Sequence, residues 1–243
     1  MITVGWVGRD RAGWSVTLRA VNATLPTAIE RLLTAEVAQE IAGAFGDRPI
    51  YPERVLIDGP DHPSLPGPQG PERRFPGWPG PVLVLSDENQ GVCSWGVPLD
   101  GHQVLVGGAA AGGTSAYAAS VEEFIAARRW DYQCASSDLC MTAQATELDQ
   151  GSLRYLQQRL ASTVTTAGWP GLRQYRFEHY DQRVMLWCDA GQCDWLISAA
   201  SEVSLKALAT EVLGLSNLRE VLSADNASSR RLLDELRASA PSW

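Results

Sequence analysis

Residues 81–97 read PVLVLSDENQGVCSWGV, and this stretch decides the fold of the first part of the chain. Val82–Leu85 is a short apolar run typical of a buried strand, and 92–97 is a second run of the same kind. The polar residues 87–91 between them include asparagine and glycine, which suit a tight turn. The stretch therefore predicts a β-hairpin with Trp95 packed in the core.

Further helices and strands are predicted on both sides of this hairpin. A turn at Asp100-Gly101 leads to a third strand at 103–106, which completes a β-meander. Upstream, apolar residues at helical spacing predict a helix over 25–41, followed by a short extended segment at 50–57. Downstream, 120–129 begins with a capping box and predicts a closing helix.

This order resembles the SUKH superfamily over roughly residues 24–130. The recurrent core of that family is a strand, a Glu-Asn-Gln-Gly motif and a second strand that carries a tryptophan. The residues that match it are Glu88, Asn89, Gln90, Gly91 and Trp95. The resemblance implies an α+β domain and, commonly, a bacterial immunity protein that binds and neutralises a cognate toxin, often a nuclease or deaminase. Some relatives are scaffolds or regulators. The family supplies no catalytic residues, and we expect the matched residues to serve the fold.

The rest of the chain repeats the rhythm of helix, three strands and helix. A helix is predicted over 152–166 and another from Ser201 to Leu213, with a last helix over 229–238. The strands between them are predicted at 172–180, 183–188 and 193–199. This region is either a degenerate second copy of the first domain or an unrelated module.

The predicted fold class is α+β. We expect a SUKH-like domain with a central antiparallel or mixed β-sheet flanked by helices, together with a hairpin over 2–21, in residues 1–140. Residues 141–243 would form a second, smaller α/β domain, a three-stranded meander with helices.

Composition limits the classes of function. The net charge is -8, with 45% hydrophobic and 20% charged residues, which argues against wholesale disorder and against a strongly basic nucleic-acid binder. No run is apolar enough to span a bilayer, and the chain's first residues lack the pattern of a signal peptide. The five cysteines are odd in number. We therefore expect a cytoplasmic protein with reduced thiols and no membrane partner.

Three groups of residues could form catalytic or ligand-binding sites, but a structural role explains each of them better. Gly107–Thr114 has the spacing of a phosphate loop, but Gly113 stands where the lysine belongs, which favours a plain small-residue loop. Four cysteines could bind zinc, at Cys134, Cys140, Cys188 and Cys193, but the first two are too widely spaced, which favours buried thiols. The histidines are scattered, at His62, His102 and His179. We predict no catalytic residue, metal or cofactor.

The proline-rich stretch 59–81 holds eight of the 14 prolines and predicts a long loop. Its aromatic residues, Phe75 and Trp78, either tuck the loop onto the core or contact a partner. Asp87 and Glu88 are either solvated turn carboxylates or an acidic rim for a basic partner.

The function that we predict is non-enzymatic protein binding, in which an acidic surface covers the active site of a toxin. The predicted contact residues are Phe75, Trp78, Asp87 and Glu88. One alternative is a scaffold or regulatory assembly protein. Another is a ligand-binding enzyme, with a nucleotide-like ligand at Gly107–Thr114 or a histidine-based site. The sequence assigns no oligomeric state.

Overall fold

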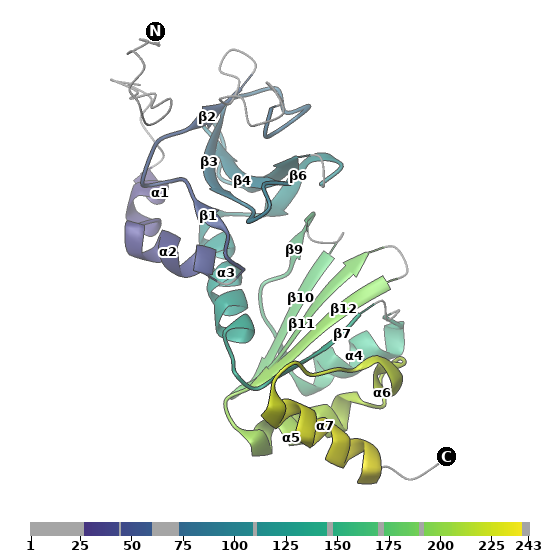
Figure 1. Ribbon diagram of the computed structural model, residues 1–243. Helices are drawn as coiled ribbons and strands as arrows, with labels where there is room; N and C mark the ends of the chain where they lie inside the picture. The colour runs from purple at the N-terminus through teal and green to yellow at the C-terminus, as the bar shows by residue number, and fades with distance from the viewer. Residues whose placement is uncertain are drawn as a thin grey trace, which may run out of the picture.

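The computed structural model describes residues 27–43, 45–59, 73–108, 111–144, 148–169, 173–189 and 192–239. This part of the chain is α+β, with two antiparallel six-stranded sheets and seven helices (Figure 1). The predicted hairpin over 2–21 and most of the proline-rich stretch lie outside the described residues.

The first sheet has the strand order β1-β3-β4-β5-β6, and β2 also pairs with β3. Its strands are β1 (Arg48–Pro49), β2 (Ile57–Asp58), β3 (Val82–Asp87), β4 (Ser94–Pro98), β5 (Val104–Gly108) and β6 (Gly113–Ala118). The predicted meander of three strands is confirmed as β3, β4 and β5, and β6 extends it.

The described ends of the segment 107–114 are paired strands, which agrees with the favoured small-residue interpretation and not with a phosphate loop. Gly107 pairs with Thr114 and Gly108 with Gly113 across β5 and β6, and a strand rather than a helix follows the turn. Gly108 and Gly113 have φ angles of 134° and 132°, which only glycine adopts readily. The glycines therefore serve backbone geometry.

Three helices pack on this sheet: α1 (Thr27–Leu32), α2 (Ala35–Gly43) and α3 (Val121–Ala135). The single helix predicted over 25–41 is two helices, because Thr34 begins a new one and its hydroxyl accepts from the backbone nitrogen of Val37 (3.3 Å). Trp95, 1% exposed, lies in the core beneath them, as predicted. Its ring meets Tyr117 edge to face at 5.9 Å.

Phe75 fills the opposite face of the sheet and is 0% exposed. A Cβ atom at Gly96 would lie 2.6 Å from the Phe75 ring, so the glycine makes the room that the ring occupies. The backbone nitrogen of Phe75 donates to the buried carboxylate of Asp58 (3.1 Å). We therefore assign Phe75 to the core and not to a contact surface.

The second sheet has the order β7-β12-β11-β10-β8, and β9 also pairs with β10. Its strands are β7 (Cys140–Ala143), β8 (Ala161–Ser162), β9 (Thr166–Ala167), β10 (Arg173–His179), β11 (Gln182–Asp189) and β12 (Gln192–Ala199). The predicted meander is confirmed as β10, β11 and β12. The described sheet has as many strands as the first, so the expectation of a smaller three-stranded unit is wrong. The missed strands have only two to four residues.

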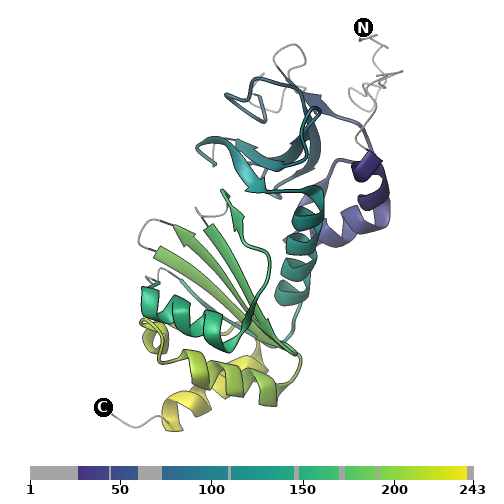
Figure 2. The ribbon, with the colours of Figure 1, turned by 180° about the vertical axis from the view of Figure 1, so that it is seen from behind.

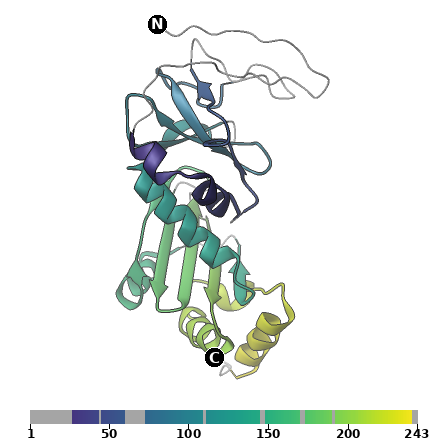
Figure 3. The same cartoon turned by 90° about the vertical axis from the view of Figure 1, so that its left-hand side faces the viewer.

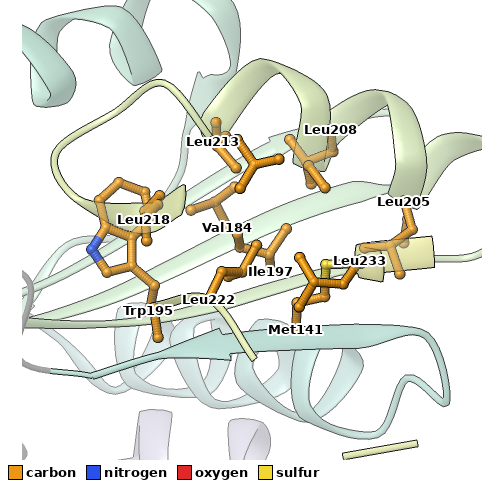
Figure 4. Packing of buried hydrophobic residues seen from close by; sticks show 14 of the residues in the cluster. Met141, Val184, Trp195, Ile197, Leu205, Leu208, Leu213, Leu218, Leu222 and Leu233 are labelled. Atoms are coloured by element: carbon orange, nitrogen blue, oxygen red, sulfur yellow. The ribbon is translucent and has the colours of Figure 1, made fainter. Parts of the chain in front are cut away.

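Four helices lie against one face of the second sheet (Figure 2): α4 (Gln150–Arg159), α5 (Glu202–Val212), α6 (Leu218–Val221) and α7 (Ala227–Ser239). Ser201 caps α5 as predicted, accepting from the backbone nitrogen of Ser204 (3.1 Å). Leucine side chains from α5 to α7 pack onto Val184, Trp195 and Ile197 of the strands (Figure 4).

Helix α3 crosses the other face of the second sheet (Figure 3). Its first half packs in the core of the first sheet through Phe124. Its second half buries Trp130 and Cys134 against Met185 and Leu196 of β11 and β12. The two sheets thus share one helix. Within the described ranges, no helix is long and apolar enough to cross a membrane.

We expect Ser120→Ala to lower the free energy of unfolding by about 1 kcal/mol, because the Ser120 hydroxyl caps α3 by accepting from the backbone nitrogen of Glu123 (3.2 Å). Urea denaturation measures the change. The control is Ser120→Thr, which keeps a capping hydroxyl, and an equal loss in both variants would contradict the capping role.

Candidate functional site

The Glu-Asn-Gln-Gly motif forms the turn that joins β3 to β4. The backbone nitrogen of Gly91 donates to the carbonyl of Glu88 (2.8 Å), and the Glu88 carboxylate accepts from the backbone nitrogen of Gln90 (2.7 Å). Gly91 has a φ of 75°. The expectation that Asn89 and Gly91 serve a turn is confirmed, because these bonds close the hairpin.

Asn89 also fastens this turn to the turn that follows α2. Its side-chain nitrogen donates to the carbonyl of Phe45 (2.7 Å), and its backbone nitrogen donates to the carboxylate of Asp47 (3.1 Å). The motif therefore positions Phe45 and Asp47, which lie outside the motif itself.

The second sheet presents a row of polar and aromatic side chains beneath these turns. Trp187 of β11 stands opposite Gln174 of β10 and Asp194 of β12. One step further along, Asp189 is paired with Gln192. Because side chains alternate along a strand, these five side chains lie on one face of the sheet. It is the same face on which α3 packs against Met185 and Leu196.

A cavity of about 490 Å³ lies between this row, the two turns and α3. Its aromatic wall residues are Phe45, Trp95, Trp169 and Trp187, and its carboxylates are Asp47, Glu88, Asp131, Asp189 and Asp194. Asp47 and Asp131 are buried, Glu88 is half-buried, and Asp189 and Asp194 are exposed. The cavity therefore has a buried polar floor and an acidic mouth.

Arg176 lies under the floor and is 0% exposed. Its guanidinium makes a two-pronged ion pair with Asp131 of α3, at 2.6 and 2.9 Å. A further nitrogen donates to the carbonyl of Val164 (3.1 Å) and to the hydroxyl of Thr166 (3.1 Å). A buried guanidinium needs such partners, so this pair holds β10 against α3.

Arg128 of α3 is a second buried guanidinium, and it lines the cavity. It forms an ion pair with Asp47 and lies 3.9 Å from Asp131. It also lies over the rings of Phe45 and Trp95, at 5.4 and 5.0 Å from their centroids. The protein therefore already stacks one cation on these aromatic walls.

Gln174 connects the two sheets at the floor. Its side-chain oxygen accepts from the hydroxyl of Tyr117 in β6 (3.2 Å) and from that of Thr166 in β9 (2.7 Å). Lower down, the indole nitrogen of Trp130 donates to Glu178 (2.9 Å). The cavity thus lies in a polar network that crosses from one sheet to the other.

The pKa values follow from this burial. Burial raises the pKa of the Asp47 carboxyl more than the charge of Arg128 lowers it. Burial lowers the pKa of Arg128, but Tyr117, Asp131 and Asp47 outweigh that effect and raise it overall. Arg128 therefore remains charged inside the protein.

The predicted contact residues do not form one surface. Asp87 is buried, and its carboxylate accepts from Arg74 (3.0 Å) and from the hydroxyl of Ser94 (2.6 Å), so we assign it to the fold. Trp78 is half-buried beside Phe75, on the face of the sheet opposite Trp95. Of the four, Glu88 alone lines the cavity.

The cysteines divide between a disulfide and buried thiols. Cys188 and Cys193 form a disulfide across β11 and β12, which contradicts our expectation of reduced thiols and removes two of the four candidate zinc ligands. Burial raises the pKa of the Cys134 thiol to about 12, which leaves it protonated beside Ser198. No cluster of metal-ligating residues occurs in the part of the chain that the structure describes.

The histidines are not brought together at the cavity. His102 is exposed near β5, and His179 ends β10 with its ring 4.4 Å from that of Tyr180. His62 lies outside the described residues. The described histidines therefore give no support to a histidine-based site.

Sequence reasoning missed most of the residues that build the cavity. The signals available were weak: Gln174 and Arg176 at alternate positions of the predicted strand 172–180, and Trp187 in the next strand. Comparison of the chain with protein-family models, with curated proteins and with solved structures finds no match.

We expect Asp131→Asn to lower the free energy of unfolding by about 3–5 kcal/mol, because it leaves Arg176 buried without its ionic partner. The double variant Asp131→Leu/Arg176→Met removes both charges and should regain a large part of that loss. Urea denaturation distinguishes the two. A double variant no more stable than Asp131→Asn would contradict the account.

We also expect a pH-dependent effect of Asp87→Asn. Burial raises the pKa of Asp87, but the hydrogen bond and charge of Arg74 and the hydroxyl of Ser94 outweigh it, so the pKa lies below the ordinary value of 3.8. A lowered pKa in the folded state stabilises the protein above the unfolded-state pKa, and the benefit disappears as the pH falls through the folded-state pKa.

Asp87→Asn should therefore cost about 1–2 kcal/mol at neutral pH, and the difference from the wild type should shrink below about pH 4. Urea denaturation at a series of pH values measures this difference. Asp100→Asn, on an exposed turn, is the control. A difference that stays constant down to the lowest pH would show that the charge of Asp87 is not involved.

Proposed function

We propose that the protein is a non-enzymatic binding protein of the SUKH immunity type, which neutralises a cognate toxin in bacterial competition. The observation that carries the proposal is the acidic mouth of the cavity, which is lined by Glu88 of the Glu-Asn-Gln-Gly turn and by Asp189 and Asp194 of the second sheet. Nucleases and deaminases bind nucleic acid, so they commonly present basic surfaces that such a mouth complements.

The rigidity of the residues around the cavity mouth also supports this proposal, in addition to their negative charge. The turn that carries Glu88 is held rigidly by Asn89, and the sheet residues opposite stand on paired strands. A preorganised surface loses little conformational freedom when it binds. The net charge of -8 would also steer a basic partner toward this protein.

A second candidate function is binding of a small molecule. The cavity, at about 490 Å³, lies within the range of about 300–1,000 Å³ that is typical of ligand sites, and aromatic rings line it. A ligand that raises the melting temperature of the purified protein without any protein partner would favour this function.

The growth of cells that carry the toxin tests the immunity function. The toxin is identified as the stoichiometric partner that co-purifies with the tagged protein from its native cells. We expect the wild-type protein to restore growth when it is co-expressed with this partner. Glu88→Arg/Asp194→Arg should abolish protection, because it reverses the charge of the mouth and repels a basic surface.

The matched control is Glu220→Arg/Asp234→Arg, which makes the same change of net charge at exposed positions on α6 and α7. It should protect as well as the wild type. Failure of the wild type to protect would overturn the immunity function, and many substoichiometric partners would favour a scaffold. Equal loss in both variants would show that total charge matters and not the cavity mouth.

A further inference from the structure

The cavity has the composition of a site for a planar organic cation. Of its charged lining residues, five are carboxylates and one, Arg128, is a cation. Arg128 pairs with Asp47, and Arg176 holds Asp131 from beneath the floor. The Arg48 guanidinium lies near Gly91 on the motif turn and is not part of the lining.

The aromatic walls are suited to the same kind of group. Arg128 lies over two of them, Phe45 and Trp95, which shows that these rings accommodate a guanidinium. Trp187 meets Phe45 edge to face, with centroids 5.9 Å apart, and is half-buried, as is Trp169. The indoles of Trp169 and Trp187 thus provide two further ring surfaces in a cavity with an acidic mouth.

We infer that this cavity binds the side chain of an arginine that the partner protein inserts from its surface. The inference rests on the proposed function, because it takes the ligand to be part of a protein. A guanidinium stacks on an indole and at the same time forms paired hydrogen bonds with a carboxylate, whereas an ammonium group is compact and more strongly hydrated. Glu88, which follows β3 of the first sheet, and Asp194, on β12 of the second, both line the cavity and are the carboxylates that we assign to it.

The test uses the whole protein and the probe acetyl-arginine-amide, with acetyl-citrulline-amide and acetyl-lysine-amide for comparison. Citrulline keeps the shape of arginine and lacks its charge. NMR of the indole N–H signals of Trp169 and Trp187 reports binding. We expect saturable shifts with the arginine compound, and a dissociation constant at least ten-fold lower than that of the citrulline compound and several-fold lower than that of the lysine compound.

The double variant Glu88→Gln/Asp194→Asn should weaken binding of the arginine compound at least ten-fold. Glu220→Gln/Asp234→Asn, which removes two exposed charges on α6 and α7, should leave it unchanged. Melting temperatures of both variants show whether they are folded. Equal binding of the citrulline or the lysine compound would overturn the assignment to a guanidinium.

Absence of saturable binding in a folded protein would also overturn the arginine site. That result would not refute the immunity function, because growth protection tests the immunity function separately. Conversely, arginine binding without growth protection would retain the site and refute its role in immunity.

Discussion

The ion pair of Arg176 with Asp131 is the constraint on which the rest of the structure depends. Both groups are almost fully buried, and a buried charge without its partner costs several kcal/mol. Strand β10 and helix α3 are therefore held at one position relative to each other. Arg128, one helical turn away from Asp131, is fixed by the same helix, and it in turn holds Asp47 and two aromatic walls of the cavity.

Helix α3 carries this constraint between the two halves of the molecule. Phe124 near its beginning belongs to the core of the first sheet, and Trp130 and Cys134 near its end pack on the second. A helix that is buried along two different cores cannot slide without exposing one of them. The cavity above its middle is therefore a permanent feature of the fold, with walls set by packing on both sides.

The Glu-Asn-Gln-Gly motif has two roles that a sequence pattern cannot separate. Gly91 and Asn89 make a turn, and a turn is all that their residue types predict. The amide of Asn89 also reaches the chain after α2 and sets Phe45 in place, while Glu88 stands at the mouth of the cavity. The same four residues thus serve the fold and shape a surface for binding.

Local signals in the sequence determined much of this protein. Alternating and apolar runs predicted β3, β4, β5, β10, β11 and β12, and serine caps placed the starts of α3 and α5, because hairpins and caps depend on neighbouring residues. Only the tertiary structure decided the rest. The edge strands are too short or too rich in small residues to leave a pattern, and Phe75 is a core residue because distant glycines make room for it. The cavity depends on residues far apart in the chain, such as Asp47, Arg128 and Trp187, whose meeting is set by strand register and helix packing and has no local signature.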